Sequence, residues 1–254
     1  MDPFVKNFSV VRHIWGKSET IIVIFSGAAA EFALSKAVDW LYFTGKLPKD
    51  PIGRLFSTVA YAHKIVFSER QAALQAIDTI THIHQAVEAK RGTVIPDWAY
   101  RDVLFMIIDY SIRAYELLER PLTDDEKEEI FLVFHAVGHR MAIKGLPDNF
   151  SEWLNMREKH LQQNLVKSHY TDDLFLQYKK HLGKIRYNML VQLQSLVVPD
   201  RVVELLGLSR KKIFKPVISF YKLGQKLHVD SLIKDVILPA QYKERINALN
   251  VDDS

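Results

Sequence analysis

Apolar residues recur at helical spacing along most of this 254-residue chain, and this periodicity is the strongest limit on its fold. Proline, glycine and capping residues separate the periodic stretches, as expected at helix ends. We find no strong strand pattern, internal repeat, glycine-rich phosphate loop or G-x-S-x-G motif. The sequence therefore predicts an all-α fold, a single multi-helix bundle with roughly eight or more helices on ordinary helix lengths.

The absence of cysteine excludes whole classes of site. The chain cannot form a disulfide, ligate an iron–sulfur cluster, attach a c-type haem, or hold haem or zinc through a thiolate. Its 48% hydrophobic and 25% charged residues are typical of a globular protein with a substantial core. A formal net charge of +4 is too small to indicate nucleic acid as a partner.

The sequence shows neither a secretion signal nor a transmembrane segment. Residues Met1 to Glu19 are polar and mixed, without the basic start and apolar core of a signal peptide. The most apolar run, Ile21 to Leu34, contains Glu31 and is too short to span a bilayer. We therefore expect a cytoplasmic protein.

Two consecutive helices between residues 50 and 87 carry the side chains of greatest functional interest. The pair Asp50-Pro51 suits an N-cap followed by the first helical position. Arg54, Thr58 and Tyr61 then share one edge of the helix, beside an apolar stripe. This edge is either a boundary face from which Arg54 reaches water or part of a binding site.

The second helix opens, by its sequence, with a capping box formed by Ser68 and Gln71. His84 falls on the apolar stripe of this helix, whereas His82 falls on the wetter side. A buried imidazole needs a partner for each nitrogen. The partner is either a buried hydroxyl or carbonyl, or a metal or haem iron on one nitrogen with an acceptor on the other. The residues alone leave both interpretations open.

Two further helices are expected before the middle of the chain. Residues 20–42 predict one helix with a small-residue waist at Gly27 to Ala30, where another helix or a flat ligand could approach closely. Val103 to Ile108 are six apolar residues in a row, which places their helix in the middle of the fold. Asp109 and Arg113 follow at i,i+4 spacing and predict an ion pair. The alternative is that Asp109 orients a neighbouring imidazole or a substrate.

A second pair of histidines lies in residues 123–144, which predict a helix opened by a Thr-x-x-Glu capping box. His135 and His139 are four residues apart and share a face, so they could chelate zinc. The metalloprotease pattern has a glutamate directly after the first histidine, where this chain has Ala136. We interpret the pair as structural, with a His-ligated metal site as the alternative.

Amphipathic helices continue through the C-terminal third. Residues 151–166, 172–182, 184–197 and 200–206 each predict a helix, with Ser151 as the expected N-cap of the first. A basic cluster follows, and it is either a solvated helix start or a contact with a membrane surface or an anion. Its members are Arg210, Lys211, Lys212 and Lys215.

Several short motifs occur in order along the chain. The first two are Asp50-Pro51-x-Gly53-Arg54-Leu55-x-x-Thr58 and Thr81-His82-Ile83-His84-Gln85-Ala86-Val87. Arg113-Ala114-Tyr115-Glu116, Arg120-Pro121-Leu122-Thr123, Gly145-Leu146-Pro147 and the segment from Val198-Pro199-Asp200 to Leu208 follow. Their order and spacing resemble the catalytic domain of the mpaB/rubber oxygenase (latex-clearing protein) family over roughly residues 20–208.

The resemblance implies a globin-like helical core that holds a non-covalent b-type haem. It implies His84 as the proximal iron ligand, with Arg54 and Thr58 lining the pocket as cofactor-binding and catalytic residues. Arg54 would pair with a haem propionate or polarise dioxygen, and Thr58 would hydrogen-bond within the pocket. Members of known activity use the iron and dioxygen to cleave carbon–carbon double bonds in isoprenoid chains.

Four positions differ from the pattern of the family. Ser57 stands where the latex-clearing branch has a basic side chain, and Thr81 and Glu88 flank His84 where that branch has arginines. Asp109 stands where many relatives have a histidine. These differences concern the surroundings of the haem rather than its proximal ligand.

The leading hypothesis is a haem-b-dependent oxygenase that oxidises or cleaves a carbon–carbon double bond. Its partners would be dioxygen, a small apolar or prenylated substrate and an unidentified electron donor, without nucleic acid. The alternatives are a non-catalytic helical protein with a vestigial haem site that binds an apolar ligand or partner, and a His-ligated metal hydrolase. We expect residues 1–19 to form an N-terminal arm, 20–208 the catalytic domain and 209–254 a helical extension packed on it.

Overall fold

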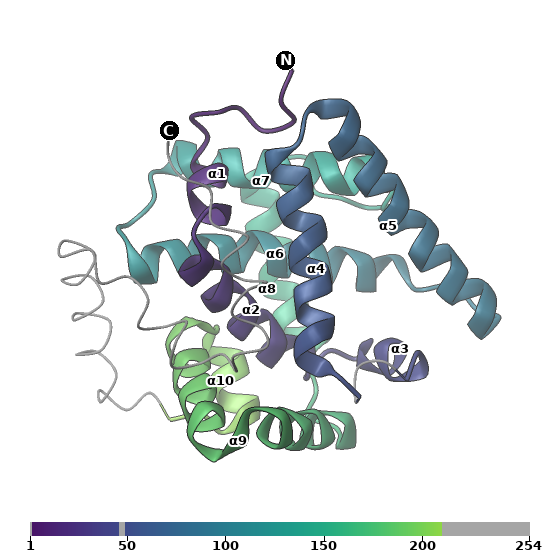
Figure 1. Ribbon diagram of the computed structural model, residues 1–254, viewed down its shortest axis with the longest axis vertical. Helices are drawn as coiled ribbons and strands as arrows, with labels where there is room; N and C mark the ends of the chain where they lie inside the picture. Colours follow the sequence, from purple (N-terminus) through teal and green to yellow (C-terminus); the bar gives the residue numbers. More distant parts are fainter. Residues whose placement is uncertain (1, 46–48, 210–254) are drawn as a thin grey trace.

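The computed structural model describes residues 2–45 and 49–209, apart from the side chains of Leu55 and Phe56, and it confirms the all-α fold (Figure 1). In these ranges the only β-type pairings are isolated bridges between Pro3 and Glu69 and between Ser35 and Leu165. The ten helices are α1 (Val10–Trp15), α2 (Ser18–Phe32), α3 (Val38–Phe43), α4 (Pro51–Phe67), α5 (Arg70–Arg91), α6 (Asp97–Leu118), α7 (Asp124–Arg140), α8 (Phe150–Gln163), α9 (His169–Val197) and α10 (Asp200–Leu206).

Helices α2 and α6 form the centre of the molecule, and the other helices surround them (Figure 1). The apolar run predicted to lie in the middle of the fold is in α6, where Leu104, Phe105, Met106 and Ile108 are buried. The exceptions are Val103, which is 38% exposed, and Ile107, which is half-buried. No described helix is long and apolar enough to cross a membrane.

The single helix predicted for residues 20–42 is wrong, because the chain forms two helices there. Helix α2 ends at Phe32, and α3 begins only at Val38. The carbonyl groups of Ala33 and Leu34 accept hydrogen bonds from the Thr171 hydroxyl (2.7 Å) and the Val166 amide (2.7 Å). Val166 lies in the segment that joins α8 to α9, and Thr171 lies in the first turn of α9. These partners satisfy the carbonyls at the end of α2, so the helix does not need to continue.

The predicted start of α4 is confirmed, and that of α5 is wrong. Asp50 caps α4 by accepting a hydrogen bond from the Gly53 amide at 2.8 Å. Helix α5 has Glu69 as its N-cap residue, without a side-chain cap. The N-terminal segment fulfils the role expected of Ser68, because the amide of Arg70 donates to the carbonyl of Asp2 at 2.8 Å.

In the later part of the chain, the observed helix ends agree better with those predicted from the sequence. The capping box of Thr123 and Glu126 opens α7, and Gly207 ends α10 with φ = 63°. Helix α8 begins earlier than predicted because Asn149, rather than Ser151, accepts the hydrogen bond of the Glu152 amide. Helix α9 contains a sharp bend at Gly183, where φ is 73°, which agrees with the two helices predicted on either side of it.

The second half of α5 is attached to the molecule mainly by polar contacts. Its buried residues, Ala73, Ala76 and Ile77, all lie in the first half. Beyond them the helix leads away from the centre towards α3 (Figure 1). At its end, Arg91 forms an ion pair with Asp39 (2.6 Å). This second half of α5 carries His84.

Candidate functional site

His84 lies on the second half of α5 and is half-buried rather than fully buried. Its ring meets the ring of Tyr100 from α6 at 90°, with 5.2 Å between the ring centroids. The Nδ1 atom is buried and has no hydrogen-bond partner of good geometry. The carbonyl of Ile80 on the same helix still acts on the imidazole, so the buried nitrogen does not by itself indicate a missing group.

The pKa of His84 is lowered from its usual value near 6.5. Burial is the largest cause, and the positive charge of Arg54 acts in the same direction. Glu88 and the carbonyl of Ile80 oppose the shift without cancelling it. The imidazole is therefore neutral at neutral pH, which is the form that can ligate a metal.

A cavity of about 140 Å³ lies beside His84. It is enclosed by one face of α5, the start of α6 and the segment that follows α7. Polar groups come from Thr81, Glu88 and Tyr100, and apolar surface comes from Met141 and Ile143. This volume is well below the roughly 300–1,000 Å³ of typical ligand pockets, so the cavity as it stands is too small for a porphyrin.

Arg54 and Thr58 lie on α4, which packs against α5. Both side chains are half-buried, and Arg54 donates a hydrogen bond to the Ser57 hydroxyl at 2.8 Å and contacts the Thr58 hydroxyl at 3.4 Å. Burial lowers the pKa of Arg54, an effect that the nearby Tyr61 partly opposes. Within residues 2–45 and 49–209, Arg54 forms no ion pair. A partly buried cation without a counter-ion is a suitable partner for an anionic group.

The structure brings these candidate residues into one region but not into one cavity. Arg54 is close enough to His84 to lower its pKa, yet neither Arg54 nor Thr58 lines the cavity beside His84. A neutral imidazole could ligate iron, and a guanidinium that forms no ion pair with the described residues could bind a propionate. The side chains therefore fit the cofactor, whereas the cavity would have to widen to admit it.

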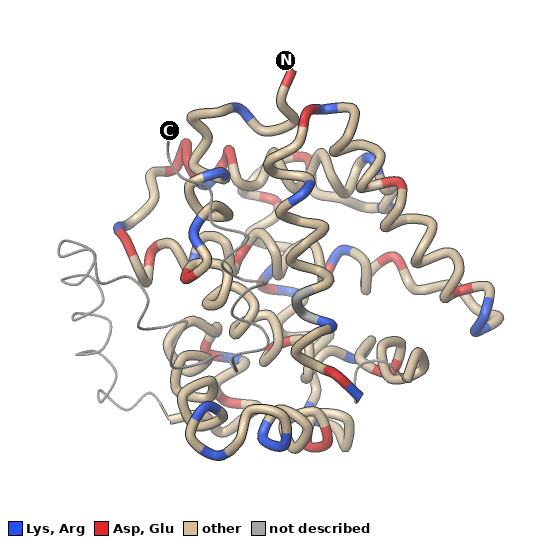
Figure 2. Tube along the Cα trace, viewed as in Figure 1, with Lys and Arg blue, Asp and Glu red and all other residues tan. Residues whose placement is uncertain are grey.

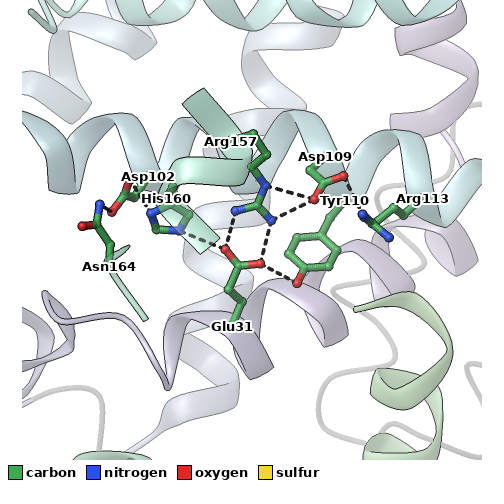
Figure 3. Close-up of polar contacts among 8 residues, drawn as sticks. All are labelled: Glu31, Asp102, Asp109, Tyr110, Arg113, Arg157, His160 and Asn164. Atoms are coloured by element: carbon green, nitrogen blue, oxygen red, sulfur yellow. Dashed lines mark hydrogen bonds and ion pairs between the residues drawn. The ribbon is translucent and has the colours of Figure 1, made fainter. Parts of the chain in front are cut away.

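A buried network of charged side chains lies at the centre of the molecule, where α2, α6 and α8 meet (Figure 3). Figure 2 shows that charged residues are spread along the helices and that some of them lie at the middle of the view. Arg157 of α8 joins the two sides of the network. Its guanidinium contacts Glu31 at 2.5 and 2.7 Å and Asp109 at 2.8 and 3.0 Å.

Two further side chains complete the contacts around Glu31 and Asp109. The hydroxyl of Tyr110 donates to Glu31 at 2.8 Å. Arg113 donates to Asp109 at 2.7 Å, which confirms the predicted i,i+4 ion pair. Burial would raise the pKa of Glu31, but the Arg157 charge and hydrogen bonds outweigh it and hold the pKa far below its usual range. Glu31 is therefore ionised in the folded protein.

His160 extends the network along α8. Its Nε2 lies 3.1 Å from Glu31, and its Nδ1 lies 2.6 Å from Asp102, which also accepts from the Asn164 amide at 2.9 Å. Burial alone lowers the pKa of His160, but the contacts with Asp102 and Glu31 are stronger together and raise it. The carboxylates of Glu31, Asp102 and Asp109 thus face the cations Arg113, Arg157 and His160. Opposite charges compensate one another across the network, which is typical of a structural role.

Sequence reasoning missed most of this network. Glu31 was noted only as a charge that interrupts an apolar run, and Arg157 and His160 were not singled out. The available signal was Glu31 itself, because a carboxylate within an apolar helix requires a buried cation. The oxygens of Asp109 contact Arg113 and Arg157, and its alternative role, orienting an imidazole or a substrate, stays a prediction.

Among the described residues, His135 and His139 do not form part of a group that could hold a metal ion. His135 is half-buried and its ring packs against Phe131, while His139 is exposed. Across the described residues, no group of three or more His, Cys, Asp or Glu side chains is arranged to hold a metal ion. The basic cluster beginning at Arg210 lies outside the described residues.

Comparison with protein families gives one match, to the catalytic domain described as ER-bound oxygenase mpaB/B'/rubber oxygenase, over residues 19–216. This range is most of the chain. The chain belongs to this oxygenase family. Comparisons with curated proteins and with solved structures found no match. Family membership indicates an oxygenase-type function, and it agrees with the resemblance found in the sequence motifs.

Proposed function

We propose that this protein is a haem-b-dependent oxygenase that uses dioxygen to oxidise or cleave a carbon–carbon double bond. The observation that carries the proposal is His84. It is a neutral, half-buried imidazole on α5, the helix that packs against the helix of Arg54. Membership of an oxygenase family supports the reaction class.

Each of the three site residues has a separate role in this proposal. His84 would ligate the iron and so hold the cofactor against α5. Arg54, which lacks an ion-pair partner in the described residues, would bind a propionate group. The hydroxyl of Thr58 would donate a hydrogen bond within the pocket. Haem, when bound, supplies the iron that makes dioxygen reactive.

The substrate class follows from the family and from the surroundings of the site. Rubber oxygenase is part of the description of the family, which suggests an alkene of isoprenoid type. Cleavage of one double bond by one dioxygen molecule gives two carbonyl groups, one oxygen atom on each, so the overall reaction needs no external electrons. A small apolar or prenylated compound is therefore the proposed substrate, and an electron donor is needed only if the product is a mono-oxygenated one.

One observation favours a second candidate function. The cavity beside His84 has a volume of about 140 Å³, too small for a porphyrin. A helical protein that retains the fold but no longer takes up haem, and binds an apolar ligand or partner instead, would have such a cavity. Haem uptake separates the two candidates.

The proposal is tested by incubating the haem-supplied protein with a short prenyl alkene under ¹⁸O₂ and measuring dioxygen consumption and product mass. We expect carbonyl products that carry ¹⁸O, and no such products from the His84→Ala variant. The matched control is His82→Ala, because His82 is exposed on the same helix. Haem-loaded protein that consumes no dioxygen with any prenyl alkene would overturn the oxygenase assignment.

A further inference from the structure

We infer that the second half of α5, residues 79–91, is a lid over the cavity beside His84. The lid turns about a hinge at residues 79–81, and two polar clasps, at Glu88 and Arg91, hold it shut. The movement concerns access to the cavity rather than the ligand that enters it, so the lid does not rest on the proposed function.

Two threonines mark the hinge, directly after Ile77, the last buried residue of α5. The Thr79 hydroxyl donates to the carbonyl of Gln75 at 2.8 Å. The Thr81 hydroxyl donates in the same way to the carbonyl of Ile77 at 3.2 Å. Hydroxyl groups bonded to the carbonyl one turn earlier often bend a helix, so we place the hinge here.

Apolar packing holds the second half of α5 only weakly. Ile80 and Val87 are half-buried, and Ile83 is 42% exposed. The first half is anchored instead, by three buried residues and by an ion pair of Asp78 with Arg140 of α7 at 2.6 Å. Opening the second half therefore removes little apolar surface from the core, which is typical of segments that open locally.

The clasp at Glu88 joins α5 to α6. The Tyr100 hydroxyl donates to the carboxylate of Glu88 at 3.0 Å. The amide of Ile95 donates to the same oxygen at 2.9 Å, but Ile95 belongs to the loop that follows α5 and moves with it. Opening of the lid therefore has to break the hydrogen bond with Tyr100.

The clasp at Arg91 joins the last residue of α5 to α3. Arg91 forms an ion pair with Asp39 at 2.6 Å, and both side chains are partly exposed. Its guanidinium also lies 4.0 Å from the centre of the Trp40 ring, in a cation–π contact. Contacts of these two kinds are weak at partly exposed sites, so the lid opens without unfolding of the rest of the protein.

Opening separates the two sides of the cavity. Thr81, His84 and Glu88 line it from α5, whereas Tyr100 lines it from α6 and Ile143 from the segment after α7. Movement of α5 away from α6 turns the cavity of about 140 Å³ into a wider cleft. The two clasps therefore control access to the imidazole of His84 from this side.

The experiment measures distances between pairs of spin labels by pulsed electron paramagnetic resonance. The chain has no cysteine, so engineered cysteines carry the only labels. The chosen positions are all exposed: Ile83 and Ala86 on the lid, Gln75 on the first half of α5 and Leu132 on α7. Paired with Leu132→Cys, both Ile83→Cys and Ala86→Cys should show a second distance, from the open lid. Gln75→Cys in the same pairing should show one distance.

Variants at the clasps change how much of the second distance is present. Arg91→Gln removes the ion pair and the cation–π contact, and should raise the ratio of open to closed protein about tenfold. Tyr100→Phe removes the hydroxyl that Glu88 binds, and should raise the ratio about fivefold. The matched control is Arg70→Gln, which removes an ion pair with Asp2 at the opposite end of the same helix and should leave the ratio unchanged.

Each other outcome would overturn the lid or one of its parts. A single distance that is the same in the native protein and in both clasp variants shows that α5 does not open. A second distance at Ala86 but not at Ile83 shows fraying of the helix end, and a second distance at Gln75 places the movement outside the hinge. Equal ratios in Arg91→Gln and Arg70→Gln show that Arg91 is not a clasp.

Discussion

Arg157 is the residue on which the buried charges of this protein most depend. It is 4% exposed and contacts two carboxylates, Glu31 and Asp109, from two other helices. Removing the cation while leaving the carboxylates in place would leave buried negative charge uncompensated. Removing one partner of a buried ion pair lowers the free energy of unfolding far more than replacing the whole pair by apolar residues does.

We predict that Arg157→Met lowers the free energy of unfolding by about 3–5 kcal/mol, measured by urea denaturation. Arg113→Met is the matched control, because Arg113 also binds Asp109 but its side chain is 38% exposed. That exposed pair should contribute less than about 1 kcal/mol. Equal losses in the two variants would contradict the central role of Arg157.

His160 makes the stability of this network dependent on pH. Its pKa in the folded protein is raised above the unfolded value near 6.5 by Asp102 and Glu31, against the opposing effect of burial. The stabilisation is therefore complete below that value and is lost as pH rises through the folded pKa. We predict that the stability difference between the native protein and His160→Asn shrinks as the pH rises through a window that begins near 6.5, the unfolded pKa.

The measurement is urea denaturation at several pH values in that window. Because both proteins share all other titrating groups, their difference isolates His160. A difference that grows with pH, or does not change, would show that His160 is not an imidazolium in the folded protein.

At the residue scale, the sequence predicts pairs that are close along the chain. The Asp109–Arg113 ion pair follows from its spacing alone. Glu31 and Arg157 are 126 residues apart, and Glu31 and His160 are 129 residues apart, so their contacts depend on how α2 packs against α8. Local spacing contains no information on such packing.

The contact between α2 and α6 depends on the absence of a side chain at one position. A Cβ atom at Gly27 would overlap the ring carbons of Tyr110, so glycine allows the ring to lie directly against the α2 backbone. From there the Tyr110 hydroxyl reaches Glu31, one turn further along α2. This agrees with the expectation that the small residues from Gly27 to Ala30 permit close approach of a helix.

We predict that Gly27→Ala destabilises the protein by about 1–3 kcal/mol, because the buried ring has no free space to move into. Helix propensity alone predicts the opposite, a gain of up to about 1 kcal/mol. The comparison variant is Gly138→Ala, where the nearest atoms are the ends of the flexible Leu104 and Leu146 side chains. Thermal unfolding of both variants tests this, and a more stable Gly27→Ala protein would contradict it.

Helix ends were predicted correctly where the capping group is local. Asp50, the Thr123–Glu126 box and Gly207 each act within a few residues of the end that they define. The predictions failed where the partner is remote, as at Glu69, which pairs with Pro3, and at Ala33, whose carbonyl binds Thr171. A remote partner can satisfy a terminal backbone group as well as a cap does, and the local sequence does not reveal it.

At the scale of the whole molecule, periodicity and motifs were sufficient for the fold class and the family. The arrangement around His84 was not predictable in the same way. It depends on the meeting of α5 with the start of α6, on a cavity of about 140 Å³, and on a second half of α5 that is fixed largely through Glu88 and Arg91. The cavity is too small for a porphyrin as it stands, and the buried residues of α5 all lie in the first half of that helix.

The most direct test of the account is the visible absorption spectrum of protein supplied with hemin, recorded before and after reduction with dithionite. We predict a Soret band that shifts on reduction, is retained in His82→Ala and is lost in His84→Ala. Full haem retention in His84→Ala, with an unchanged spectrum, would contradict the assignment of His84 as the iron ligand. A native protein that takes up no hemin would contradict the haem site itself.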